Sequence, residues 1–223
     1  AGKTTLFKII STQEKTSSGE LLFKNLNLNA LNISQTADYR KKLGIVFQDF
    51  RLLPDKTAYE NVAFAMEAAG RTDEEIASDV PHVLELVDLG KKLHNFPHEL
   101  SGGEKQRVAI ARAIVNQPDV IIADEPTGNL DSVNGLLVMN LFKRINKERG
   151  TTIIFVTHDQ EEALSMSDRV VVMSEGVITQ IGTPRQVYED PACLSVAKFI
   201  GEVNIFETVV EAVNGDKLTV TVE

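Results

Sequence analysis

The chain has 223 residues, of which 43% are hydrophobic and 25% charged, values typical of one large globular domain or of a domain with a subdomain. Its net charge of -9 argues against a nucleic-acid-binding protein, which usually carries a basic surface. No apolar run reaches the roughly 20 residues of a membrane-spanning helix, so we expect any membrane role to depend on a partner protein. The single cysteine, Cys193, excludes an internal disulfide and is expected to pack as a small apolar residue.

The chain begins with the residues A-G-K-T-T, followed by a predicted helix over residues 6–11. These residues form the second half of the phosphate-binding loop G-x-x-x-x-G-K-[ST], whose first glycine we expect before residue 1. Gly2 would let the backbone approach the phosphates, Lys3 would bind the β- and γ-phosphates, and Thr4 would offer its hydroxyl to Mg²⁺. The predicted nucleotide-binding set is completed by Ala1 and Thr5. Taken alone, the fragment slightly favours an ordinary helix start with a solvated lysine.

Apolar strands then alternate with helices along the chain. Strands are predicted over residues 43–47, 119–123, 152–156 and 169–173, and helices over 73–89, 102–116, 134–148 and 160–165. Continuous apolar strands separated by helices predict an α/β fold with a parallel sheet that is covered on both faces. Near the end of the chain, β-branched residues flank Asn214-Gly215, which is a strong hairpin signal and predicts the start of a small β domain.

Two adjacent carboxylates, Asp124 and Glu125, follow the predicted strand over residues 119–123. In open α/β sheets, ligands bind beyond the carboxyl ends of the strands. Asp124 is expected to hold Mg²⁺ through its water shell, and Glu125 to act as the general base for a water that attacks the γ-phosphate. The pair alone is equally consistent with two solvated acids at a strand exit.

A second glycine-rich segment, L-S-G-G-E over residues 100–104, opens the predicted helix over 102–116 and offers accessible N–H groups. With A-G-K-T-T, Gln48, D-E and His158 in this order, the sequence resembles the ABC ATPases from Ala1 to about Phe206. The resemblance implies a P-loop NTPase fold with three parts. They are a RecA-like nucleotide-binding core at 1–48 and 113–198, an ABC helical subdomain at 49–112, and the start of an OB/TOBE-like β domain at 199–223.

The resemblance also assigns roles to single residues. Gln48 matches the Q-loop glutamine that senses Mg²⁺ and the attacking water, and His158 matches the switch histidine that contacts the γ-phosphate. Asp131, in the D-loop of residues 129–131, would cross a dimer interface. The signature residues expected to bind the ATP held by the other subunit are Ser101, Gly102, Gly103 and Glu104. Many family members have glutamine in place of Glu104, and the aromatic residue that stacks on adenine is expected before residue 1.

A signature loop that acts on the partner's ATP implies a head-to-tail homodimer that sandwiches two ATP molecules. ATP binding and hydrolysis would then shift the population between closed and open dimers. An apolar patch beside the Q-loop is expected to contact a membrane subunit. This patch consists of Phe50, Leu52, Leu53 and Tyr59. The other three histidines are expected at the surface or in packing roles.

Two branches of the family are matched. Residues 44–54, 57–62 and 123–131 resemble the cell-division ABC ATPase, whereas 159–164, 182–184 and 199–204 resemble importers of polyamines, maltose or ferric iron, polyamines most closely. We therefore expect the ATP-hydrolysing subunit of an importer, bound peripherally to the cytoplasmic face of the inner membrane. Its partners would be permease subunits and an extracytoplasmic solute-binding protein, with no nucleic acid. The alternatives are a cell-division-type ATPase that transports no solute, and a chain that joins parts of two genes.

Overall fold

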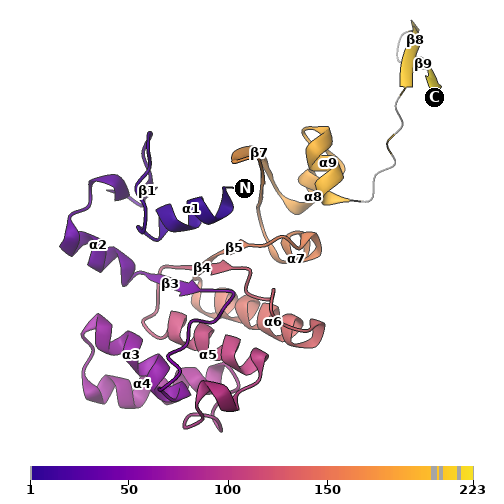
Figure 1. The fold of residues 1–223 in the computed structure, drawn as a ribbon. Helices are drawn as coiled ribbons and strands as arrows, with labels where there is room; N and C mark the ends of the chain where they lie inside the picture. Colours follow the sequence, from indigo (N-terminus) through magenta and orange to yellow (C-terminus); the bar gives the residue numbers. More distant parts are fainter. Residues whose placement is uncertain (1, 202–204, 206–207, 215–216, 223) are drawn as a thin grey trace.

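The computed structural model describes residues 2–201, 205, 208–214 and 217–222. Its centre is a parallel sheet in the order β3 (Leu43–Val46), β4 (Val120–Asp124) and β5 (Thr152–Val156), shown in Figure 1. The register pairs Leu43 with Val120, and Val120 with Thr152. The predicted α/β fold with a parallel sheet is therefore confirmed.

Helices cover both faces of this sheet because successive side chains of a strand point to opposite faces. Ile122 packs against one cluster, which includes Phe7 of α1 (Lys3–Ile10) and Tyr39 of α2 (Ile33–Arg40). Ile121 packs on the other side, in the large core formed with α5 (Gly102–Ile114) and α6 (Ser132–Arg149). The two short strands β1 (Leu22–Phe23) and β2 (Leu26–Asn27) form a hairpin between α1 and α2.

The helical part of the chain consists of α3 (Ala58–Ala69), α4 (Asp73–Leu86) and α5, which pack together below the sheet in Figure 1. Each begins with a capping box in which a hydroxyl residue and a glutamate three positions later exchange hydrogen bonds. Thr72 caps α4 as predicted, although the helix ends at Leu86, three residues early. The helix α6 begins two residues earlier than predicted because Asp131 caps it.

The predicted strand at 169–173 is present as β6 (Val170–Ser174), but it does not join the parallel sheet. It pairs antiparallel with β7 (Val177–Gly182), a strand that the sequence analysis did not predict. The turn between them has Glu175 at φ 51° and Gly176 at φ 84°, and two left-handed residues in a row are what a tight hairpin requires. Consequently β5 is an edge strand among the described residues, and Ile154 is 37% exposed although we predicted a buried strand.

The β6–β7 hairpin is followed in the chain by two short helices, α8 (Pro184–Glu189) and α9 (Leu194–Ile200). The helix α7 (Gln160–Met166) comes directly before the hairpin in the sequence. Buried valines of β6, α8 and α9 hold these elements together in a third small core. Cys193 lies at the start of α9 and is exposed, with its Sγ 3.0 Å from Ser195 Oγ, so the expectation that it packs in a core is wrong.

The predicted hairpin near the end of the chain is present as β8 (Thr208–Asn214) and β9 (Lys217–Val222), which pair antiparallel. Gly215 of the turn signal lies outside the described residues. The identity of this segment as an OB/TOBE-like domain stays a prediction, and so do the domain boundaries. Within the described part of the chain, no helix is both long and apolar enough to cross a bilayer.

Candidate active site

Three residues that are far apart in the sequence meet at the carboxyl edge of the parallel sheet. Lys3, in the first turn of α1, donates from Nζ to the Thr157 carbonyl at 2.7 Å. The same Nζ lies 3.1 Å from His158 Nδ1, and His158 Nε2 lies 3.2 Å from Glu125 Oε1. Parallel strands bring their carboxyl ends to one edge, which is why β4 and β5 deliver Glu125 and His158 to the same place.

Burial and mutual repulsion act on the charged groups of this cluster. Burial lowers the pKa of Lys3, and the carboxylates of Glu125 and Asp124 oppose this effect. The pKa of Asp124 is raised, first by burial and then by the neighbouring charge of Glu125, while Lys3, Arg51 and His158 pull it back. Two carboxylates that repel each other at a partly buried site are stabilised by a bound cation.

The residues present fit a magnesium site better than a site for a softer metal. Within the described residues, no group of three or more His, Cys, Asp or Glu side chains is arranged to hold a metal ion. The candidate donors are instead the oxygens of Asp124, Gln48 and Thr4. Mg²⁺ is usually bound through one or two carboxylates together with phosphate oxygens, and this donor set matches that preference.

Glu125 itself has an unusual backbone conformation. Its φ is 45°, in the left-handed region, which a residue other than glycine adopts at a cost of about 1–2 kcal/mol. Its N–H donates to the Val156 carbonyl at 2.7 Å, and its carbonyl accepts from Gly128 N–H at 3.1 Å. These two hydrogen bonds hold the turn and aim the Glu125 side chain toward His158 and Lys3.

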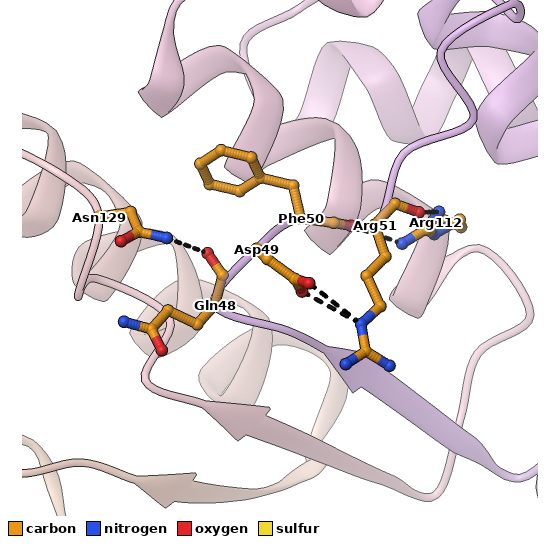
Figure 2. Close-up of polar contacts among 6 residues, drawn as sticks. All are labelled: Gln48, Asp49, Phe50, Arg51, Arg112 and Asn129. Atoms are coloured by element: carbon orange, nitrogen blue, oxygen red, sulfur yellow. Dashed lines mark hydrogen bonds and ion pairs between the residues drawn. The ribbon is translucent and has the colours of Figure 1, made fainter.

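A cavity of about 370 Å³ lies beside the cluster. It is lined by Phe47, Gln48, Asp49, Arg51, Asp124 and Asn129. The Gln48 carbonyl accepts from Asn129 Nδ2 at 2.9 Å, as Figure 2 shows. Gly128 lies against the Gln48 amide, because a Cβ added there would come 2.7 Å from Nε2. Gln48 is therefore packed against the turn that follows β4 and lines this cavity.

The backbone after Gln48 is held by an arginine from α5. Phe50 and Arg51 both have a left-handed φ, at 59° and 47°. The half-buried guanidinium of Arg112 donates to both of their carbonyls, at 2.8 Å and 2.6 Å (Figure 2). The Arg51 side chain pairs with Asp49 at 3.1 Å and lies over the Phe47 ring at 3.9 Å. Sequence reasoning missed Arg112, whose only signal is a lone arginine within the apolar run of α5.

The apolar patch predicted beside the Q-loop is only partly available to a partner. All four of its residues are partly buried. Leu52 and Tyr59 pack against the large core, which leaves Phe50 and Leu53 as the members that do not contribute to it. The histidines at positions 82, 94 and 98 are exposed, as expected.

The signature residues have structural roles that the sequence analysis did not assign. Ser101 caps α5, since Glu104 N–H donates to its Oγ at 3.3 Å and Ser101 N–H donates to Glu104 Oε2 at 2.8 Å. The hydrogen bond from the Ser101 backbone lowers the pKa of Glu104. Gly103 is buried against Asn134 of α6, with no room for a Cβ. Gly102 is exposed and contacts little.

Asp131 accepts from Asn134 through both carboxylate oxygens, at 2.9 Å from N–H and 2.7 Å from Nδ2. These bonds lower its pKa. Within the described residues, no hydrogen bond or ion pair joins the signature loop or Asp131 to Lys3, Glu125 or His158. This separation agrees with the prediction that the signature loop acts on the ATP site of another subunit. That role stays a prediction.

The start of the phosphate loop differs from the prediction in one respect. The helix α1 begins at Lys3 and not at Leu6, so Thr4 and Thr5 lie in its first turn, where both are exposed. Gly2 has φ 98°, and a Cβ added there would come 2.9 Å from the Gly176 Cα. The position thus requires glycine on both conformational and steric grounds. Ala1 lies outside the described residues.

The comparisons with known proteins agree with this geometry. The model of the family described as ABC transporter matches residues 1–128, which is more than half of the chain. The chain therefore belongs to the ABC transporter family, with the fold of its ATP-binding cassette. The likeness to solved structures supports the fold. The dimeric ATP-binding cassette MJ0796 bound to ADP and Pi matches with a TM-score of 0.73 and 36% identity, over 82% of this chain and 81% of that one.

Among curated proteins, the chain is similar to several spermidine/putrescine import ATP-binding proteins named PotA. It is 43% identical over 222 residues to the one from Marinobacter nauticus, covering 100% of this chain and 58% of that protein. It is 44% identical over 222 residues to the one from Legionella pneumophila strain Paris, covering 100% of this chain and 60% of that protein. The chain thus spans somewhat more than half of the length of these relatives.

Proposed function

We propose that this chain is the ATP-binding and ATP-hydrolysing part of an ABC importer that takes up a polyamine such as spermidine or putrescine. The observation that carries the proposal is the contact series from Lys3 through His158 to Glu125 at the carboxyl edge of the sheet. His158 lies within hydrogen-bonding distance of both Lys3 and Glu125, which supports roles for Lys3 as the phosphate-binding cation and for Glu125 as the base. The polyamine assignment rests on the names of the relatives, which align with the whole chain.

In the proposed mechanism, Lys3 and the N–H groups of the first turn of α1 bind the β- and γ-phosphates of ATP. Glu125 removes a proton from a water molecule, whose oxygen attacks the γ-phosphorus. The bond from that phosphorus to the β,γ-bridging oxygen breaks, which releases ADP and inorganic phosphate. His158 accepts from Lys3 at Nδ1 and donates from Nε2 to Glu125, and so holds the base in line with the attacking water.

Mg²⁺ held by Thr4, Gln48 and Asp124 would neutralise phosphate charge as the bond breaks. Asp124 is suited to this role because burial and Glu125 already raise its pKa, so that a bound cation relieves an unfavourable charge. Ser101, Gly102 and Gly103 would complete the site of a second copy in a head-to-tail dimer. The permease, the solute-binding protein and a peripheral position at the cytoplasmic face of the membrane belong to the same proposal.

The cell-division alternative is not favoured. Its support is the resemblance of residues 44–54, 57–62 and 123–131 to the cell-division ABC ATPase, yet the spermidine/putrescine import proteins align with the chain through all three segments. The same continuous alignment supports a single gene over a junction of two. A membrane partner that stimulates hydrolysis without any solute would favour the alternative again.

The first test uses the full-length protein and the variant Glu125→Gln. We expect ATP binding with Mg²⁺ to be retained and phosphate release to fall by about 10²–10⁴-fold, because the amide cannot accept the proton. Glu148→Gln, at an exposed position near the end of α6, is the matched control and should keep wild-type turnover. Wild-type turnover in Glu125→Gln would contradict the assignment of the base.

The second test concerns the solute. The full-length protein is reconstituted in vesicles with its permease and solute-binding protein, and phosphate release is measured with and without spermidine or putrescine. Stimulation that requires one of these solutes, with its accumulation in the vesicles, supports the importer. Stimulation by a different solute class would refute the polyamine assignment while leaving the ATPase intact.

A further inference from the structure

One carboxylate joins the ends of the two strands that carry the reacting groups. Glu162, in the first turn of α7, accepts from Thr127 Oγ1 at 2.5 Å and from Thr157 Oγ1 at 3.1 Å. Thr127 follows Glu125 by two residues, and Thr157 directly precedes His158. A single side chain is therefore bonded to the neighbours of both the base and the histidine.

The contacts close a ring around the site. From Glu125 the chain passes to Thr127, whose hydroxyl reaches Glu162, and from Glu162 a second bond reaches Thr157. His158 then returns to Glu125 at 3.2 Å. The turn within this ring is braced, because Gly128 N–H donates to the Glu125 carbonyl. The ring therefore links the positions of Thr127 and Thr157 to those of Glu125 and His158.

Glu162 itself is held firmly. Asp159 caps α7, with its Oδ1 accepting from Glu162 N–H at 3.0 Å, and Asp159 N–H donates to Thr157 Oγ1 at 2.9 Å. Hydrogen bonds to an ionised acceptor are about twice as strong as those between neutral groups. The Asp159 cap thus fixes the backbone of Glu162, and the two threonine hydroxyls hold its carboxylate between the two strand ends.

The histidine needs such a restraint. Its side chain is 70% exposed, and its two ring nitrogens contact only the Lys3 amine and the Glu125 carboxylate within the described residues. It also follows β5, which is an edge strand in the described part of the chain. Packing alone therefore does little to fix the position of the imidazole. The hydrogen bond from Thr157 to Glu162 restrains the residue directly before His158 and so limits the movement of the histidine.

We propose that Glu162 is a positioning residue for ATP hydrolysis, which sets the separation of His158 and Glu125 through the hydroxyls of Thr157 and Thr127. The inference rests on the proposed ATPase function and adds a residue to it. Glu162 does not touch the nucleotide in this role. A misplacement of about 1 Å in a catalytic arrangement can reduce the rate by up to ~10²-fold, so the loss of this restraint should be visible in turnover.

The test compares Glu162→Ala, Glu162→Gln and Thr127→Val in the full-length protein, with Glu161→Ala as the matched control. Glu161 lies in the same turn of α7 and is exposed. We expect kcat to fall by about 10–10²-fold in Glu162→Ala, with the KM for ATP within about twofold of wild type. Glu162→Gln keeps one acceptor oxygen and should recover part of kcat. Thr127→Val should lower kcat, and Glu161→Ala should not.

Two further measurements separate positioning from a simple structural role. In a Glu125→Gln background, Glu162→Ala should cause no further loss, because the group it positions has been removed. The imidazole NMR signals of His158 report its hydrogen bonds without any turnover, and they should move in Glu162→Ala and not in Glu161→Ala. A lower melting temperature in Glu162→Ala with unchanged kcat and unchanged His158 signals would overturn the inference. The proposed function fails separately, if the wild type itself does not hydrolyse ATP.

Discussion

Replacing Gly103 with alanine tests the packing of the signature loop against α6. The added Cβ would lie 2.6 Å from Asn134 Cγ and 3.0 Å from Asn134 Cβ, distances that real Cβ atoms rarely show. The Asn134 side chain would have to rotate away from Asp131, to which it donates. Overpacking of this kind costs about 1–3 kcal/mol, and the higher helix propensity of alanine returns at most about 1 kcal/mol. We therefore expect Gly103→Ala to lower the free energy of unfolding by about 1–2 kcal/mol.

The matched control is the neighbouring glycine. A Cβ added at Gly102 would meet the Leu130 Cδ2 at 3.6 Å, which is an ordinary van der Waals contact. Gly102→Ala should therefore leave the free energy of unfolding unchanged or raise it slightly. The assay is urea denaturation followed by circular dichroism, without nucleotide, so that any role in ATP binding does not contribute.

A double-mutant cycle identifies the clash itself. Asn134→Gly removes the obstructing side chain, so Gly103→Ala should become neutral or stabilising in that background. The reasoning is refuted if Gly103→Ala is as stable as Gly102→Ala, or if its cost is the same with and without the Asn134 side chain.

Two other predictions concern stability. Asn61 is wholly buried and holds the loop before α3, because it accepts from Leu53 N–H at 2.7 Å and donates to three backbone carbonyls. Asn61→Ala removes these hydrogen bonds, so it should lower the free energy of unfolding in urea by about 3 kcal/mol. Asn140→Ala, at an exposed position on α6, should change it little, and equal effects would contradict the reasoning. The raised pKa of Asp124 means that its stability contribution is fully present below its ordinary pKa of 3.8 and is lost as pH rises through the folded-state value. Without nucleotide or Mg²⁺, Asp124→Asn should therefore melt at a higher temperature than wild type at pH 7, and the difference should vanish below about pH 3.8. A lower melting temperature of Asp124→Asn at pH 7 would contradict a raised pKa of Asp124.

Local sequence patterns predicted what depends on neighbours in the chain. The cap at Thr72 and the strand before Asp124 follow from residue types a few positions apart, and both are present. The pairing of β6 did not follow, because an apolar strand looks the same whether it joins a parallel sheet or folds back on the next strand. The left-handed backbone of Glu175 and Gly176 turns the chain back so that β6 pairs with β7. Of these two residues, only the glycine is a turn signal in the sequence.

The candidate site divides in the same way. The residue types at Lys3, Glu125 and His158 indicated a nucleotide site, and the structure brings these three side chains together. The residues that hold them were not predictable, since Arg112 and Glu162 act on segments 61 and 35 positions away. Such contacts depend on how the helices pack on the sheet. A short stretch of sequence does not contain that information.

The left-handed backbone at Glu125 has a consequence for any attempt to improve this protein by selecting for stability. A glycine at this position would relieve the conformational cost without disturbing a helix or a strand. A screen that reads only abundance or heat resistance would therefore enrich glycine there, and the enriched molecules would lack the carboxylate that faces Lys3. With Glu125 in its proposed role as the base, folding and catalysis favour different residues at this position, and a stability score alone would rank glycine above the residue that hydrolysis requires.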